Sequence, residues 1–234
     1  MKRAAALGLA LASTAPPGAH GARPMVTDDA RLADAGACQF ETWVRRNDAS
    51  TEYWAMPACN PWGGVELGFG AARTQAGAGG RFSDALLQAK TLLRPLREDS
   101  WGLAVTVGTY RHPVRVHDHR WPGDPYVNVP FSVSVLSDSW VAHVNAGAIR
   151  ERDSGRTLGT WGFGHEVRLR EDLFLTAEAF RADFGRPLYQ VGLRHWVVRD
   201  RVQVDGSAGT RGGGSAREHG FTLGVHLQFP PFRP

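Results

Sequence analysis

One stretch near the C-terminus decides the fold: it reads Phe221-Thr222-Leu223-Gly224-Val225-His226-Leu227-Gln228-Phe229. Every odd-numbered position of this stretch is apolar, and every even-numbered position is polar or glycine. A period of two is the pattern of a β-strand, whose successive side chains point to opposite faces. The stretch is therefore predicted to be a strand with one face in an apolar environment.

The same alternation recurs along most of the chain, for example in residues 100–111, 125–136 and 157–170. No segment after residue 37 has comparable helical periodicity, although residues 83–94 are ambiguous. An even number of strands, several near ten residues long, is typical of a transmembrane antiparallel up-and-down β-barrel. We expect twelve strands, at residues 37–46, 51–57, 63–73, 83–94, 100–111, 125–136, 140–150, 157–170, 173–184, 188–198, 201–210 and 220–229.

The overall composition fits this all-β fold class. The chain has 234 residues, of which 42% are hydrophobic and 21% are charged, so it is too apolar for a disordered protein. Its mean hydropathy is −0.29, and no run approaches the roughly 18 consecutive apolar residues that a spanning helix needs. A globular domain or a membrane β-barrel remains, and the alternation favours the barrel.

The connections between the predicted strands fall into two classes. Short, acidic turns lie at residues 97–99, 137–139, 170–172 and 199–200, whereas long loops lie at 74–82, 111–124 and 211–219. The two classes largely alternate, as expected for tight periplasmic turns and long extracellular loops. The strands also begin with aromatic residues, which are expected to form two girdles at the membrane surfaces or, alternatively, to be ordinary core aromatics: Trp101, Trp140, Trp161 and Tyr189.

The N-terminus has the order of a secretory signal peptide. Lys2 and Arg3 precede an apolar run at residues 4–12, which small residues follow at 13–22. We predict a signal peptide at residues 1–22 with cleavage near Ala22; the alternative is an internal core helix.

The predicted location is the bacterial outer membrane. The chain after the signal peptide is predicted to divide into an N-terminal periplasmic segment (23–36), the barrel (37–229) and a C-terminal tail (230–234). The sequence leaves open whether residues 28–36 form a plug, a free tail or part of the barrel.

Export has a consequence for the two cysteines, Cys38 and Cys59. In an oxidising compartment pairing is the default, and the two lie at the same end of the first two predicted strands. A zinc or catalytic role has little support, because no Cys-x-x-Cys motif is present. We expect a structural disulfide.

The polar side chains, which occupy every second position of the predicted strands, face the lumen of the barrel. So many ionisable side chains would be costly in a soluble core without partners, whereas in a barrel they meet water and one another. Pro130 within a strand removes a ladder hydrogen bond, so we expect a bulge there. The lumen residues predicted to line a transport path are Glu41, Arg45, Glu66, Lys90, Glu166, Arg168, Glu178, Arg194, Asp205 and His226.

Several blocks of sequence resemble a known family: Asp28-Asp29-Ala30-Arg31-Leu32-Ala33-Asp34-Ala35-Gly36-Ala37-Cys38-Gln39, Glu52-Tyr53-Trp54, Gln88-Ala89-Lys90-Thr91-Leu92-Leu93-Arg94-Pro95-Leu96 and Gly192-Leu193-Arg194-His195-Trp196-Val197-Val198-Arg199-Asp200. The chain is similar over most of residues 28–229 to the outer-membrane transporters assigned to the MetA pathway of phenol degradation. The resemblance implies a monomeric outer-membrane barrel for hydrophobic or aromatic small molecules, with no catalytic residues to carry over. Such barrels usually end in an aromatic residue read by the assembly machinery, whereas here residues 230–234 follow Phe229.

Other chemistry finds less support in the sequence. Ser134, His143, Asn145 and His165 could form a hydrolase site, but no Gly-x-Ser-x-Gly is present, and lumen or interface positions are favoured. His117 and His119 could bind a metal, but a solvated loop is favoured. The glycine clusters at 77–80 and 212–214 are interpreted as loops, because neither leads from a strand into a helix. We expect no catalytic residue, cofactor or metal.

The basic charge bears on partners. The net charge is +4, and all but two of the 27 basic residues are arginine. No basic run has the interleaved aromatics of a nucleic-acid groove, so nucleic acid is not expected. Arginines pair with phosphates, including those of lipopolysaccharide, or simply solvate a surface. The expected partners are outer-membrane lipid and lipopolysaccharide, the barrel-assembly machinery and a small solute.

The function hypothesis is a passive channel or transporter for small solutes, among them hydrophobic or aromatic ones. A twelve-stranded barrel encloses more space than an eight-stranded one, whose interior is nearly filled by side chains, but far less than a sixteen-stranded porin. Paired lumen charges could therefore close the path. This leaves a non-conducting structural or interaction barrel as the alternative and a hydrolase as the least favoured function.

Overall fold

A computed structural model describes residues 23–77, 80–111, 123–181, 186–212 and 219–231. The predicted signal peptide with its cleavage site, the loop that carries His117 and His119, and the last three residues of the C-terminal tail lie outside these ranges. The glycine clusters at 77–80 and 212–214 are described only in part.

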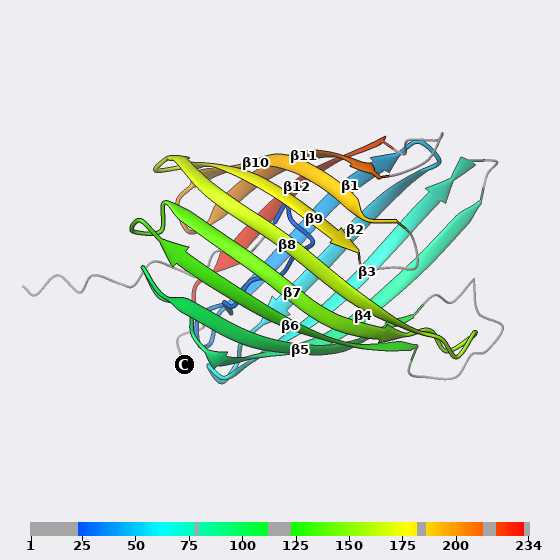
Figure 1. Ribbon diagram of the computed structural model, residues 1–234, viewed down its shortest axis with the longest axis horizontal. Coiled ribbons are helices and arrows are strands. Elements are labelled where there is room, and N and C mark those ends of the chain that lie inside the picture. The colour runs from blue at the N-terminus through cyan, green and yellow to red at the C-terminus, as the bar shows by residue number, and fades with distance from the viewer. Residues whose placement is uncertain (1–22, 78–79, 112–122, 182–185, 213–218, 232–234) are drawn as a thin grey trace, which may run out of the picture.

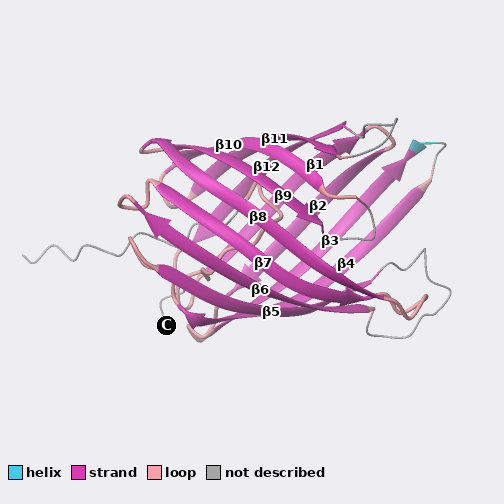
Figure 2. Cartoon of the chain, in the orientation of Figure 1, coloured by secondary structure: helices cyan, strands magenta, loops and turns pink. Residues whose placement is uncertain are grey.

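The described chain forms a closed barrel of twelve antiparallel strands (Figures 1 and 2), which confirms the predicted fold class. Each strand pairs with the next one in the sequence, and the last pairs with the first. The strands are β1 (Cys38–Asn47), β2 (Ser50–Cys59), β3 (Val65–Ala76), β4 (Arg81–Arg94), β5 (Trp101–Arg111), β6 (Asp124–Val135), β7 (Trp140–Arg150), β8 (Thr157–Arg170), β9 (Leu173–Arg181), β10 (Leu188–Val198), β11 (Val202–Arg211) and β12 (His219–Phe229).

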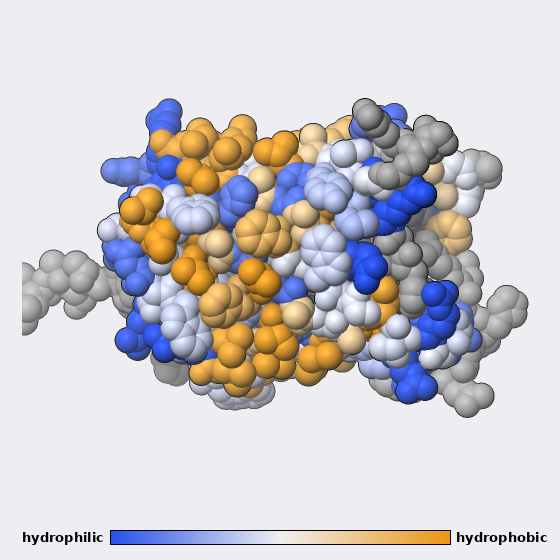
Figure 3. Space-filling model, in the orientation of Figure 1, coloured by the Kyte–Doolittle hydropathy of each residue, from blue (hydrophilic) through white to orange (hydrophobic). Residues whose placement is uncertain are grey.

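The alternating sequence determines which side chains face outward. On β12, Phe221 and Leu223 are exposed on the outer wall, whereas Thr222 and His226 are buried inside. Figure 3 shows apolar side chains over much of the outer wall on one side, with hydrophilic ones toward both ends. Because the sheet closes on itself, all strand edges are paired and an apolar outer wall can face lipid. The protein is an outer-membrane β-barrel.

No helix in the part of the chain that the structure describes is long and apolar enough to cross a membrane.

The four predicted short turns lie together at one end of the barrel. At the other end the predicted long loop 74–82 is wrong in extent, because β3 runs to Ala76 and β4 begins at Arg81, which leaves residues 77–80 as the connection. The turns after β4, β6, β8 and β10 lie at the end where the C-terminus lies (Figure 1). Asp99, Asp138 and Asp200 in these turns have positive φ angles of 49°, 57° and 56°. Asp tolerates this left-handed conformation better than most residues, which accounts for the acidic turns. The predicted girdle residues are all exposed on the outer wall: Trp101, Trp140, Trp161 and Tyr189.

The bulge predicted at Pro130 is wrong. The pairs Leu103–Phe131 and Thr106–Asn128 keep one register on either side of it, so no residue is inserted. Pro130 is fully buried and pairs with Asn145 of β7. The missing N–H therefore interrupts the ladder with β5 without shifting it. The register shifts instead near the short turns, in β4, β8 and β10.

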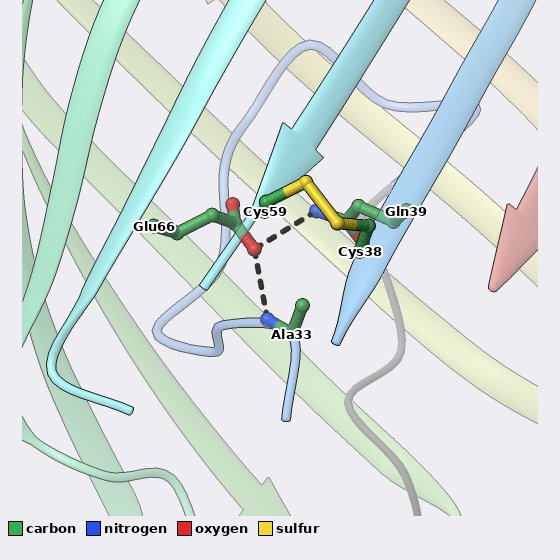
Figure 4. Close-up of a disulfide and its surroundings, with 5 residues drawn as sticks. All are labelled: Ala33, Cys38, Gln39, Cys59 and Glu66. Carbon is green, nitrogen blue, oxygen red and sulfur yellow. Dashed lines mark hydrogen bonds between the residues drawn. A yellow bond between two sulfur atoms is a disulfide. The ribbon is translucent and has the colours of Figure 1, made fainter. Parts of the chain in front are cut away.

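The predicted disulfide is confirmed. Cys38 and Cys59 are direct partners in the β1–β2 ladder, and their sulfur atoms are bonded (Figure 4). The bridge closes β1 and β2 at the short-turn end, next to the point where the chain enters the barrel wall.

We expect mass spectrometry of a proteolytic digest of the unreduced protein to detect the peptides that contain Cys38 and Cys59 as a linked pair. The bridge closes a loop of sequence separation 21, so its reduction should lower the free energy of unfolding by about 3 kcal/mol. The control is the same digest after reduction and alkylation, in which the two peptides separate. Two alkylated cysteines in the unreduced sample would contradict the pairing.

Candidate functional site

Residues 23–36, here called the lumen segment, run through the interior of the barrel. The segment contacts β3 through Ala33, β6 through Ala30 and β11 through Arg23, so it crosses the lumen. An extended segment has unpaired backbone N–H and C=O groups that need partners when buried. The polar side chains of the barrel wall provide those partners, which explains the position of the segment.

Two wall residues hold the first part of the lumen segment. The backbone N–H groups of Val26 and Thr27 both donate to the carboxylate of Glu178, at 2.8 Å each. Asn145 pairs with Asp28 in both directions: it accepts from the Asp28 N–H at 2.8 Å and donates to the Asp28 carbonyl at 2.7 Å. Glu178 and Asn145 therefore replace a neighbouring strand for these residues.

The second part of the segment is held in the same way. The N–H of Ala30 donates to Ser132 Oγ at 3.0 Å, and the N–H of Ala33 donates to Glu66 Oε2 at 2.8 Å. Asn60 Nδ2 donates to the Ala33 carbonyl at 2.7 Å. Figure 4 shows Glu66 between Ala33 and Gln39, whose amide also donates to this carboxylate, at 3.1 Å.

Ion pairs add charge complementarity between the segment and the wall. Lys90 Nζ lies 2.7 Å from Asp28 Oδ1 and 3.2 Å from Asp29 Oδ1. Arg23 Nη2 lies 3.1 Å from Asp205 Oδ1, and both side chains are buried. Of the predicted transport-path residues, Glu66, Lys90, Glu178 and Asp205 thus bind the lumen segment, and Arg194 Nη1 donates to the Arg23 carbonyl at 3.5 Å.

Glycines on the lumen face leave room for this segment. A Cβ atom at Gly162 would lie 2.7 Å from Thr27 Oγ1, and one at Gly192 would lie 2.9 Å from Pro24 Cγ. Such distances are too short for van der Waals contact. The glycines therefore accommodate the lumen segment as well as neighbouring wall side chains.

A second network joins the wall strands to one another. Arg194 Nη1 donates to Glu166 Oε1 at 3.1 Å, and Nη2 contacts the other carboxylate oxygen. His143 Nε2 lies 3.5 Å from Glu166 Oε1, and His143 Nδ1 lies 2.8 Å from Ser132 Oγ. Arg194 is only 1% exposed, so this network is inaccessible to solvent.

The other predicted path residues lie apart from these networks. His226 Nδ1 lies 3.1 Å from Glu41 Oε1, in a buried pair between β12 and β1. Arg45 lies 4.0 Å from Glu52. The guanidinium of Arg168 contacts Ser137 and Ser139 of the β6–β7 turn, so it belongs to the end of the barrel.

The residues considered for a hydrolase site do not come together. Ser134 bonds Asp138 of the following turn, Asn145 holds the lumen segment, and His165 lies beside Phe163. Ser132, which was not predicted, lies in line with His143 and Glu166: its Oγ hydrogen-bonds His143 Nδ1, and His143 Nε2 lies 3.5 Å from Glu166 Oε1. However, Ser132 and His143 are 0% exposed, and Ser132 Oγ already accepts the Ala30 N–H. This line holds the lumen segment.

Within the described ranges, no group of three or more His, Cys, Asp or Glu side chains could hold a metal ion.

A cavity of about 290 Å³ lies between the lumen segment and the wall formed by β1–β6. Its wall has two aromatic pairs. Trp43 and Trp54 are stacked with ring centres 5.4 Å apart, and Tyr110 and Tyr126 lie 5.2 Å apart. Leu86, Met56 and Met25 add apolar surface, and Gln39, Glu41, Arg45, Gln88 and Asn128 add polar groups. We call this cavity the aromatic chamber.

Sequence reasoning missed the aromatic chamber. Trp43 has the same parity as Glu41 and Arg45, so its lumen position could have been found from the alternation. A second cavity, of about 220 Å³, lies nearer the long loops and shares Arg45 with the chamber.

Comparisons with solved structures support the fold. The KdgM porin matches with a TM-score of 0.61 and 8% identity, covering 82% of this chain and 99% of that chain. The NanC porin matches with a TM-score of 0.58 and 10% identity over 82% and 100% of the two chains. The COG4313 outer membrane channel from Pseudomonas putida F1 gives 0.57 and 12% over 86% and 98%. These likenesses show a shared fold.

Sequence comparison shows the family. No curated protein matches the chain significantly. Residues 7–229 match the family described as "Uncharacterised conserved protein UCP029691". That match covers the whole barrel and is not a match to the MetA family, whose resemblance stays an interpretation. The chain belongs to the UCP029691 family, and its barrel is similar to outer-membrane porins and channels.

Proposed function

We propose that this barrel is a passive channel for small solutes, aromatic or hydrophobic ones in particular, and that the lumen segment closes it in the state described here. The observation that carries the proposal is the aromatic chamber, which lies inside the lumen and combines stacked rings with a few polar groups. Binding sites for small molecules have this composition. The similarity in fold to porins and channels agrees with it.

The chamber geometry favours a solute with one ring. Its volume of about 290 Å³ is at the lower end of ligand-pocket sizes. The stacked rings of Trp43 and Trp54 and the ring of Tyr126 line the space for an apolar body, and the Arg23 guanidinium lies over the Trp43 ring at 4.2 Å. Arg45 and Gln88 could orient one polar substituent, such as a hydroxyl or carboxylate. This solute class is also the one that the MetA resemblance implies.

A second candidate, a non-conducting structural or interaction barrel, is favoured by the filled part of the lumen. The charged residues there are paired with the lumen segment or with one another, as in Lys90–Asp28 and Arg194–Glu166. If the segment never leaves, no solute passes.

The proposal extends to export and partners. We propose a signal peptide at residues 1–22, and insertion by the barrel-assembly machinery with Phe229 as the internal aromatic signal. Phe229 is exposed on the outer wall and pairs with Cys38 at the start of β1, where a closing strand would be recognised. Outer-membrane lipid and lipopolysaccharide are the proposed surroundings.

We expect the double substitution Trp43→Ala/Trp54→Ala to weaken the binding of phenol and benzoate about five- to a hundredfold, because two ring contacts worth about 0.5–1.5 kcal/mol each are lost. Isothermal titration of the folded barrel in detergent measures the change. The matched control is Trp101→Ala, which removes an exposed ring on the outer wall and should leave the affinity unchanged.

Liposome swelling then distinguishes the two candidates. Permeation of phenol and benzoate in preference to sugars would support the channel. Equal affinity in the chamber variant and the wild type would overturn the chamber as the binding site. Binding without permeation by any variant of the barrel would favour the non-conducting barrel.

A further inference from the structure

Three arginines form an exposed patch on the outer wall at the long-loop end of the barrel. Arg46 is on β1, Arg73 on β3 and Arg81 on β4, and all three are exposed. They have the parity of outward residues such as Val44 and Tyr53, which are 38% and 44% exposed. Their guanidinium groups therefore belong to the surface that meets the membrane. We call these three residues the arginine patch.

The strand register brings the three together. Arg46 pairs with Thr51, Thr51 with Gln75, and Gln75 with Arg81, so they lie in one row across four strands. With strands about 4.8 Å apart, this row spans about 14 Å between its two arginines. Arg73 lies two residues nearer the middle of the barrel, between the same strands. Long arginine side chains from these positions can reach a shared group.

Within the residues that the structure describes, none of Arg46, Arg73 and Arg81 forms an ion pair with a carboxylate. Asp48, in the β1–β2 turn, accepts the backbone N–H of His219. The row between the arginines contributes only neutral polar side chains, Thr51 and Gln75.

Three arginines at the opposite end of the barrel have partners within the protein. Arg199 lies 3.2 Å from Glu171, and Arg170 lies 3.7 Å from Asp172. Arg94 lies over the ring of Trp101 at 3.9 Å. The arginine patch has no such partner among the described residues, so we expect it to pair with a group outside the protein, because clustered positive charge at a lipid boundary is unfavourable without one.

We propose that Arg46, Arg73 and Arg81 form a binding site for the phosphate groups of lipopolysaccharide. The long loops mark the extracellular end of an outer-membrane barrel, so the patch lies at the headgroup level of the outer leaflet. Guanidinium groups bind phosphate oxygens through two parallel hydrogen bonds. Tyr53, exposed beside Arg73 in the ladder, has the amphipathic ring typical of this depth. The inference deepens the lipopolysaccharide partner proposed above and is independent of solute transport.

The test compares lipopolysaccharide binding by the wild type and by the triple variant Arg46→Gln/Arg73→Gln/Arg81→Gln. Both are refolded into phospholipid nanodiscs that contain lipopolysaccharide, and the bound glycolipid is counted by native mass spectrometry. We expect the triple variant to bind at least about tenfold more weakly, because several charge-assisted hydrogen bonds are lost. Dephosphorylated lipopolysaccharide should bind the wild type as weakly as intact lipopolysaccharide binds the triple variant.

Matched variants make the outcome decisive. Arg94→Gln/Arg170→Gln/Arg199→Gln changes three arginines at the other end and should bind like the wild type. The triple lysine variant at the patch keeps the charge without the bidentate geometry, so intermediate binding is expected. Heat-modifiable migration in gel electrophoresis verifies that each barrel is folded. Equal binding by the wild type and the glutamine triple variant would overturn the site, as would equal binding of phosphatidylglycerol in place of lipopolysaccharide. These outcomes leave the channel proposal untouched.

Discussion

Deletion of residues 23–36 is expected to raise the flux of small solutes through the barrel by more than about tenfold, because a twelve-stranded lumen is wider than its own side chains fill. The lumen segment binds β3, β6, β7 and β9 through its backbone N–H groups and β11 through the Arg23 side chain, so it spans the lumen from wall to wall. Without it, water can hydrate the wall carboxylates that it covers. Liposome swelling and single-channel conductance measure the change.

A locked variant provides the opposite test. A Cβ atom at Gly164 would lie 3.4 Å from Thr27 Cβ, close to the separation in disulfides, which is about 3.5–4.5 Å. Oxidised Thr27→Cys/Gly164→Cys should therefore hold the segment in place and conduct less than the wild type, and reduction should restore wild-type flux. Reduced wild type is the control for the native Cys38–Cys59 bridge. If the folded deletion variant conducts no more than the wild type, the wall charges themselves close the barrel and the non-conducting alternative gains support.

The fold could be predicted from the sequence because its signals are local. Alternation fixed the parity of each strand, and the acidic turns marked the short connections, so the predicted strand boundaries agree with the structure within a few residues. Even residues 83–94, which were ambiguous, follow the rule, since Leu86 and Lys90 are buried and Leu87 is exposed. The bulge expected at Pro130 is absent because a residue without an N–H can leave one ladder hydrogen bond unformed without a shift of register.

The site was less predictable because its contacts are not periodic. The parity argument placed Glu66 and Glu178 in the lumen, but their partners are backbone N–H groups of residues 26, 27 and 33. Backbone N–H groups are common to almost all residues, so a sequence pattern does not indicate which of them bind a wall carboxylate. Arg168 has lumen parity too, yet it is near the strand end, where the register shifts and a turn provides its partners. Parity thus indicates which face a residue occupies and not what it binds.

The second large effect concerns stability. Replacement of Arg194 by Met should lower the free energy of unfolding by about 3–5 kcal/mol, because it leaves the buried carboxylate of Glu166 without its charged partner. Arg194 is 1% exposed and donates through two nitrogens to Glu166, so water cannot take over the lost interaction. Urea unfolding of the barrel in lipid vesicles, followed by tryptophan fluorescence, measures the difference.

A double-variant comparison separates loss of the pair from loss of packing. Arg194→Met/Glu166→Met removes both charges, and replacement of a buried pair by apolar residues is often close to neutral. We therefore expect the double variant to recover at least half of the stability lost by Arg194→Met. Arg168→Met is the matched control: its partners are in the β6–β7 turn at the barrel end, so its cost should stay below about 1 kcal/mol. If the double variant is no more stable than Arg194→Met, the effect comes from packing against Phe174, whose ring centre lies 4.7 Å from the guanidinium carbon, and not from an unpaired charge.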